Sequence, residues 1–134
     1  MRTNYTKAKL SQGKVVFGGL INEYSPRTVE LFGAIGYDFV MIDCEHGHMN
    51  VEELENMVRA AEVFGISPIA RVPNNDDSTI LSFLDRGVQG IIAPHVHTRG
   101  QAEAVVKSTL YSPEGERGSG GGRPHDYGMG VTRE

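Results

Sequence analysis

Three glycines, Gly36, Gly65 and Gly87, divide the central part of this sequence into repeats of one pattern: a helical segment, a glycine and a short apolar run. Glycine often ends a helix because it adopts the left-handed backbone conformation without a steric cost. A helix between two apolar strands joins them in parallel through a right-handed crossover. The repeat therefore predicts consecutive βαβ units that share one parallel sheet.

Hydrophobic spacing and capping residues place the strands and helices of these units. The expected strands are the apolar runs at 15–21, 39–42, 66–72 and 90–94. The expected helices begin at Pro26, after Asn50, after Asp76 or Asp77, and at about Gln101. Four such units are half of a (β/α)8 barrel, which needs roughly 250 residues.

A half barrel leaves two open sheet edges and one uncovered inner face. Three arrangements remain open: the first half of a longer barrel, a half barrel that closes against a second copy, and a flavodoxin-like open sheet. Beyond the α/β region, seven glycines lie between positions 115 and 130. We therefore expect a domain at 1–114 and a flexible glycine-rich tail at 115–134, which lacks the Lys-Ser/Thr ending of a P-loop.

Composition excludes several classes of function. The net charge of -4 and the pI near 5.7 provide no basic surface for nucleic acid or for an anionic membrane. No apolar run approaches the roughly 18 residues of a spanning helix, and residues 1–7 lead into no signal-peptide core. Cys44 is the only cysteine, so no intrachain disulfide can form. We expect a cytoplasmic protein that acts on a small molecule.

Polar side chains follow three of the expected strands. Asp43, Glu45 and His46 follow the second strand, Arg71 and Asn74 the third, and His95 and His97 the fourth. The carboxyl ends of parallel strands open onto the same face, so these groups are expected to converge there. An arginine at such a position can anchor a substrate carboxylate. A plain ion pair between Arg71 and Asp43 or Glu45 is the alternative.

Two further features of this region allow more than one interpretation. Histidines two positions apart share a side of a strand, so the pairs His46/His48 and His95/His97 could bind a metal, although surface loops often carry such pairs too. Cys44 alternates away from its two acidic neighbours. That alternation predicts a buried structural thiol rather than a nucleophile.

Five short motifs occur in a fixed order along the chain. They are Ile-Asp-Cys-Glu-His-Gly at 42–47, Ala-Arg-Val-Pro-x-Asn-Asp at 70–76, Leu-Asp-x-Gly at 84–87, Ile-Ala-Pro at 92–94 and Tyr-Ser-Pro-x-Gly-x-Arg-Gly at 111–118. Over about residues 15–118 the series resembles the HpcH/HpaI family of class II, metal-dependent pyruvate aldolases. The resemblance implies a (β/α)8 barrel of the phosphoenolpyruvate/pyruvate type, assembled as a homo-oligomer that is usually a hexamer.

The resemblance also implies an activity. Members of the family cleave a 4-hydroxy-2-oxo acid to pyruvate and an aldehyde, using Mg²⁺ or Mn²⁺, with Co²⁺ as a further candidate. His46 matches the catalytic base, Arg71 the arginine that binds substrate and stabilises the transition state, and Asp85 the aspartate that raises the basicity of the histidine. Asp43 and Glu45 then become supporting carboxylates at the rim, and the metal-binding glutamate and aspartate are expected beyond Glu134.

The placement of Asp85 and the expected metal ligands leave two questions open. Helical spacing puts Asp85 at the end of a helix that faces away from the rim, so it either serves a neighbouring subunit's site or has a structural role. Because the expected metal ligands are not in this sequence, a truncated, non-catalytic barrel that acts as an assembly or interaction module remains the alternative function.

Overall fold

A computed structural model describes residues 3–129 of the chain. Its elements are α1 (Tyr5–Ser11), β1 (Gly18–Ile21), α2 (Pro26–Ala34), β2 (Phe39–Asp43), α3 (Val51–Phe64), β3 (Ser67–Arg71), α4 (Asp77–Asp85), β4 (Gly90–Ile92), α5 (Arg99–Thr109) and a 3₁₀ helix η1 (Arg123–Gly128). The strands form one parallel sheet in the order β1-β2-β3-β4. The predicted βαβ units are confirmed, and the sequential order excludes the flavodoxin-like alternative, in which β1 lies inside β2.

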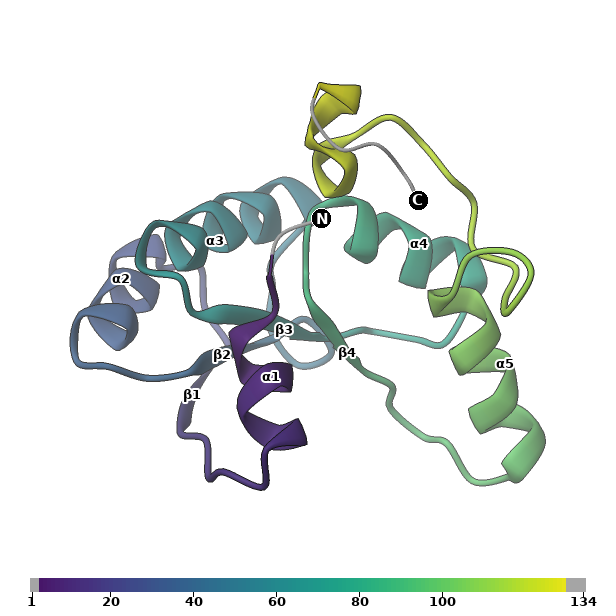
Figure 1. Cartoon of the computed structure of the whole chain (residues 1–134), viewed down its shortest axis with the longest axis horizontal. Helices are drawn as coiled ribbons and strands as arrows, with labels where there is room; N and C mark the ends of the chain where they lie inside the picture. The colour runs from purple at the N-terminus through teal and green to yellow at the C-terminus, as the bar shows by residue number, and fades with distance from the viewer. Residues whose placement is uncertain (1–2, 130–134) are drawn as a thin grey trace.

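The two faces of the sheet differ in how they are covered. Helices α2, α3 and α4 lie along one face (Figure 1), where Val40, Ile42 and Ala70 are fully buried. The opposite face carries Leu20, which is 54% exposed, and Ile92, which is 36% exposed. The molecule is therefore the first half of a (β/α)8 barrel, with its helical outer layer in place and its inner face open.

The glycines that end the predicted helices have the expected conformation. Gly36, Gly65 and Gly87 all have positive φ values, of 90°, 69° and 98°. At the other end of α3, the Asn50 side chain accepts the backbone N–H of Glu53, and the Glu53 side chain accepts that of Asn50. Such a reciprocal cap satisfies two N–H groups that a helix start leaves unpaired. None of the described helices is long and apolar enough to cross a membrane.

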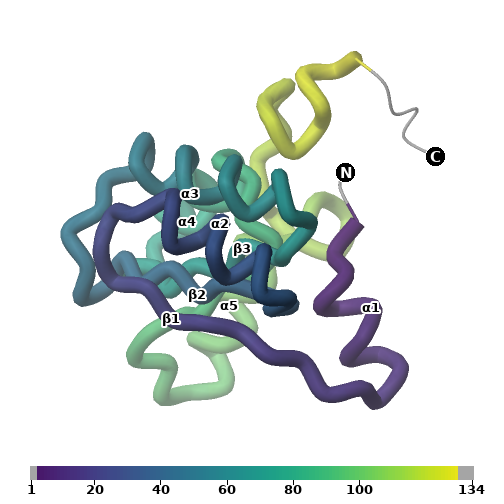
Figure 2. Tube along the Cα trace, turned by 90° about the vertical axis from the view of Figure 1, so that its left-hand side faces the viewer, coloured from purple at the N-terminus to yellow at the C-terminus, as the bar shows by residue number. Residues whose placement is uncertain are grey.

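Helix α1 is not among the elements that the hydrophobic pattern of the sequence predicts. It lies apart from the other helices (Figure 2) and binds the amino ends of the strands through side chains. Asn4 donates to the carbonyl of Gln89 and accepts from the hydroxyl of Ser67, while Thr6 donates to the carbonyl of Asp38. These contacts place α1 at the end of the sheet opposite the carboxyl ends of the strands, so the predicted site stays open.

Three strands are shorter than their apolar runs, and β3 loses one residue at each end. The first begins at Gly18 rather than at position 15, and Val15 is 75% exposed. The last ends at Ile92 rather than at position 94, because Pro94 has no N–H to donate to a neighbouring strand. Apolar character alone extended these predictions beyond the residues that pair.

The glycine-rich segment after α5 contains the short helix η1 where the sequence predicted only a loop. Arg123 at its start donates to the carboxylate of Glu62 in α3 at 2.6 Å and to the backbone carbonyl of Arg86 at 3.3 Å. This charged contact holds η1 against the barrel. The glycine-rich composition of the segment gives no sign of it. The flexibility expected for 115–134 stays a prediction, and positions 130–134 lie outside the described residues.

Close packing between α2 and α3 leads to a stability prediction. A Cβ atom on Gly33 would overlap the Cβ of Phe64, whereas no atom lies within 4 Å of the corresponding position on Gly100 in α5. We expect Gly33→Ala to lower the free energy of unfolding by about 1–3 kcal/mol through overpacking. Gly100→Ala should raise it by up to about 1 kcal/mol through helix propensity.

Urea unfolding followed by circular dichroism compares the two variants with the parent chain. Equal effects of the two substitutions would contradict the contact between the helices, because propensity alone favours alanine at both positions.

Candidate active site

The centre of the site is a charged pair at the ends of two adjacent strands. Asp43, the last residue of β2, is the register partner of Arg71, the last residue of β3. The guanidinium donates to both carboxylate oxygens, with Nε 2.9 Å from Oδ1 and Nη2 2.5 Å from Oδ2. Both side chains lie on the open inner face, since they alternate with the residues that face the helices. The ion pair that the sequence allowed between these residues is present.

Asp43 also holds the loop that follows its strand. Its Oδ1 accepts the backbone N–H groups of Glu45 at 3.1 Å and of His46 at 3.3 Å. The hydrogen bond from Arg71 is the main cause that lowers the pKa of Asp43 from 3.8 to about 2, against the opposing effect of burial. The carboxylate therefore stays charged and fixes both the guanidinium and the turn.

A second carboxylate, that of Glu45, joins residues from three strand ends. Its oxygens lie 3.3 Å from Nε of Arg71, 3.0 Å from Nε2 of His95 and 4.0 Å from Nε2 of His46. The Glu45 side chain is only 12% exposed, whereas those of His46 and His95 are 70% and 76% exposed. A largely buried carboxylate thus lies between one guanidinium and two accessible imidazoles.

The contact between Glu45 and His95 was not predicted, although both residues were placed at the rim. His95 has a φ of 53°, a left-handed conformation that is uncommon for a residue other than glycine. The carbonyl of the preceding Pro94 accepts a hydrogen bond from the Asn75 side chain at 2.5 Å. In the sequence, only the expected convergence of the strand ends points to this contact. That convergence does not specify which side chains pair.

Gly47 allows the loop after β2 to pack closely. A Cβ atom on this residue would overlap the carbonyl oxygen of Asp43 and crowd that of Asn22 in the loop after β1. Only a residue without a side chain fits between these two backbone segments. The glycine of the Glu-His-Gly motif therefore has a steric role next to the predicted base.

Asp85 does not join the other predicted site residues within this chain. It is the last residue of α4, at the end of the sheet where β4 begins, and its carboxylate accepts from Nη2 of Arg117 at 3.1 Å. The Arg117 guanidinium also stacks over the Tyr111 ring, 4.7 Å from its centroid. Both expectations for Asp85 remain: a structural contact, which is present, and a role in another subunit's site.

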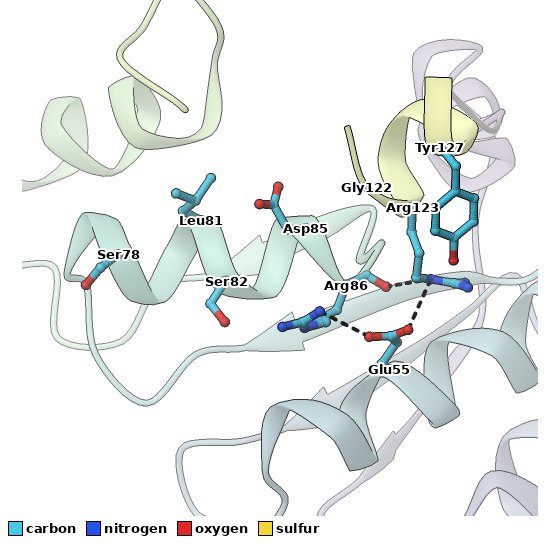
Figure 3. A pocket seen from close by; sticks show the side chains of 9 residues that line it. All are labelled: Glu55, Ser78, Leu81, Ser82, Asp85, Arg86, Gly122, Arg123 and Tyr127. Carbon is cyan, nitrogen blue, oxygen red and sulfur yellow. Dashed lines mark hydrogen bonds and ion pairs between the residues drawn. The ribbon is translucent and has the colours of Figure 1, made fainter. Parts of the chain in front are cut away.

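Asp85 lines a separate cavity on the outer side of the barrel, between α3, α4 and η1 (Figure 3). Glu55 lies at the centre of its charged wall, 3.3 Å from Nη1 of Arg86 and 3.9 Å from Nε of Arg123. The charged groups in this wall neutralise one another. The cavity shares no residue with the charged cluster at the strand ends.

Cys44 is buried, as the alternation of the strand predicted. Burial, together with the charge of Asp43, raises the pKa of its thiol to about 12. The thiolate is the nucleophilic form of cysteine, so Cys44 packs as a small apolar side chain.

The carboxylates and histidines of the rim do not fit a metal ion by themselves. Across residues 3–129, no three His, Cys, Asp or Glu side chains form a group that could hold one. Both oxygens of Asp43 are bound by Arg71, and the two His-x-His pairs are not brought together around one point. The metal site implied by the resemblance is thus not formed by the part of the chain that the structure describes.

The sequence and the fold both match known proteins. A family model described as HpcH/HpaI aldolase/citrate lyase matches residues 18–127. The 4-hydroxy-2-oxovalerate aldolase of Novosphingobium aromaticivorans is 39% identical over 126 residues, which cover 93% of this chain and 48% of the relative.

Two crystal structures resemble the chain over most of its length. An HpcH/HpaI aldolase from Desulfitobacterium hafniense DCB-2 superposes with a TM-score of 0.84 at 32% identity, covering 96% of this chain and 49% of that one. Citrate synthase SbnG superposes with a TM-score of 0.78 at 42% identity, covering 84% of this chain and 46% of that one. The chain therefore spans about half the length of these relatives.

The lowered pKa of Asp43 predicts how stability depends on pH. Because the value in the folded chain is about 2 and the ordinary value is 3.8, the charged pair stabilises the fold above pH 4 and loses its contribution as the pH falls towards 2. The shift corresponds to about 2 kcal/mol. We expect Asp43→Asn to remove this component of the pH dependence.

The measurement is the free energy of unfolding in urea between pH 2 and pH 6 for the parent chain and for the variant. The difference between the two should shrink as the pH falls. A difference that is the same at every pH would show that the charge of the Asp43 carboxylate does not contribute to the free energy of unfolding.

Proposed function

The chain belongs to the HpcH/HpaI aldolase/citrate lyase family, and from this premise we propose that it cleaves a 4-hydroxy-2-oxo acid to pyruvate and an aldehyde. The observation that carries the proposal is the juxtaposition of His46, Arg71 and the carboxylates of Asp43 and Glu45 at the open ends of β2 and β3. A base and a fixed cation on one face are what carbon–carbon cleavage next to a carbonyl requires. The name of the Novosphingobium relative, 4-hydroxy-2-oxovalerate aldolase, supports this substrate class.

Arg71 is suited to hold the oxygen on which negative charge develops. Asp43 fixes its Nε and Nη2, while Nη1 makes no hydrogen bond with any residue from 3 to 129. The guanidinium is therefore oriented in advance and still has a donor for the oxygen at C2 of the pyruvyl unit. A preorganised donor stabilises the enolate oxyanion more than a mobile one, because it does not have to reorient as charge forms.

His46 is suited to act as the base. Its backbone N–H is held by Asp43, and its ring is accessible, with Nε2 4.0 Å from the Glu45 carboxylate. In the cleavage direction His46 would take the proton of the C4 hydroxyl while the C3–C4 bond breaks. The electron pair of that bond moves into the enolate of pyruvate, and C4 becomes the aldehyde carbon.

A divalent ion would help to chelate the 2-oxo acid and stabilise the enolate when bound. The described residues do not form a site for one, and the roles proposed for Arg71 and His46 do not depend on it. We propose that its ligands, a glutamate and an aspartate, belong to the other half of a complete barrel. A homo-oligomer, in which Asp85 of one chain could reach the site of the next, is part of the same proposal.

A panel of 4-hydroxy-2-oxo acids tests the activity through coupled detection of pyruvate, with Mg²⁺, with Mn²⁺ and after chelation. We expect His46→Ala to lower kcat by about 100-fold or more, because the base is lost, with little effect on KM. Arg71→Lys should lower kcat and weaken binding, because lysine cannot make the paired contact with Asp43.

His48→Ala is the matched control, since His48 is exposed two positions further along the same loop. Its kinetics should equal those of the parent chain. Failure of the parent chain to release pyruvate from any substrate would favour the non-catalytic module instead.

The proposed mechanism involves no covalent adduct with a lysine. Treatment with borohydride in the presence of pyruvate should therefore leave the mass of the chain unchanged. An increase that corresponds to a reduced lysine–pyruvate adduct, measured by intact-mass spectrometry, would refute the class II assignment.

A further inference from the structure

We propose that His95 is a second acid–base residue of this site and exchanges a proton with C3 of the pyruvyl unit. The inference rests on the proposed function. Aldol cleavage requires two separate proton transfers, one from the C4 hydroxyl and one to C3 of the enolate. The site holds two imidazoles next to different oxygens of the Glu45 carboxylate, and the proposed function assigns a role only to that of His46.

Glu45 orients His95 more closely than it orients His46. Its carboxylate lies 3.0 Å from Nε2 of His95 but 4.0 Å from Nε2 of His46. A carboxylate that accepts from one imidazole nitrogen fixes the tautomer and leaves the other nitrogen for proton transfer. With Nε2 facing the Glu45 carboxylate, Nδ1 of His95 is the reactive position.

The exposure of the Glu45 and His95 side chains fits a shielded anchor and an accessible proton carrier. The Glu45 side chain is 12% exposed and the His95 side chain 76% exposed, so the anchoring oxygen is shielded while most of the ring is accessible. Glu45 also contacts Arg71, the residue proposed to hold the C2 oxygen. The shared carboxylate therefore places the His95 ring near the atom next to C3.

The backbone around His95 is held in an uncommon conformation. The φ of 53° lies in the left-handed region, and Asn75 binds the carbonyl of Pro94 immediately before it. Non-glycine residues in this region are strained, and such strain is concentrated at functional sites. The conformation directs the chain at the end of β4 so that the imidazole reaches Glu45.

The proton transfer can be written for pyruvate alone. Nδ1 of neutral His95 takes a proton from the methyl carbon C3, and the C–H electron pair forms the C2=C3 double bond as the C2 carbonyl oxygen becomes an enolate held by Arg71. In the reverse step the imidazolium returns a proton to C3 and the carbonyl reforms. In deuterated water the returned proton is a deuteron, so the methyl group exchanges without any aldehyde.

A purely structural role for His95 is the competing explanation, because its contact also positions Glu45. Glutamine separates the two roles. In His95→Gln the amide nitrogen takes the place of Nε2 and can still donate to Glu45, but it cannot carry a proton between atoms. His95→Ala removes both functions.

The experiment follows loss of the pyruvate methyl signal by proton NMR in deuterated buffer that contains Mg²⁺. We expect His95→Gln and His95→Ala to slow exchange by a similar factor of about 100. His97→Gln is the matched control and should exchange at the parent rate, since its ring lies 6.3 Å from that of His95 and has no carboxylate partner among residues 3–129. Exchange by His95→Gln within twofold of the parent rate would overturn the proposal.

A second measurement does not depend on activity. Nitrogen-15 chemical shifts of the His95 ring report its tautomer. We expect the Nε2–H form to predominate in the parent chain and to predominate no longer in Glu45→Ala. A predominant Nδ1–H form in the parent chain would also overturn the assignment.

Failure of the proposed aldolase function would give a different set of results from failure of the role of His95. If the parent chain neither releases pyruvate nor exchanges the pyruvate methyl group, the proposed aldolase activity is refuted, and the role of His95 is refuted as well. If the parent chain does both and His95→Gln is unimpaired, only the role of His95 is wrong. Circular dichroism of His95→Ala checks that a slow rate does not reflect unfolding.

Discussion

The paired contact between Asp43 and Arg71 is the interaction on which the site depends. It joins the carboxyl ends of β2 and β3, and through Asp43 it also holds the backbone of the loop that carries Glu45 and His46. The Asp43 side chain is only 4% exposed. A charge at such a position is tolerated only when it is paired and hydrogen-bonded. The same pair therefore joins the strand ends and orients the guanidinium that is proposed to bind the substrate.

Around this pair the charges form a connected cluster rather than separate residues. Glu45 extends it from Arg71 to His95 and lies near His46, so three strand ends share one network. Helix α1 occupies the opposite end of the sheet through Asn4 and Thr6. One end of the half barrel is thereby packed for stability, and the other presents its polar groups on an open face. This division between the two ends is general for the fold.

The open inner face relates the chain to its longer relatives. Leu20 and Ile92 are partly exposed on the side that the second half of a barrel covers in a complete (β/α)8 fold. The chain spans about half the length of the relatives that it matches, and the described residues form no metal site. The residues proposed to bind the substrate oxygen and to transfer protons, Arg71, His46 and His95, all lie on this half.

Local signals in the sequence determined most of the fold. The helix-ending glycines and the apolar runs specified the parallel βαβ order, because helix termination and strand burial depend on a few neighbouring residues. They also placed Asp43, Glu45, His46 and Arg71 at one rim. Only the tertiary structure decided which of these side chains meet, since Glu45 and His95 are 50 positions apart and their contact depends on strand register and on the turn at Pro94. For the same reason, the docking of α1 on the sheet, the place of Asp85 beside Arg117 and the contact of Arg123 with α3 depend on long-range packing that no local pattern encodes.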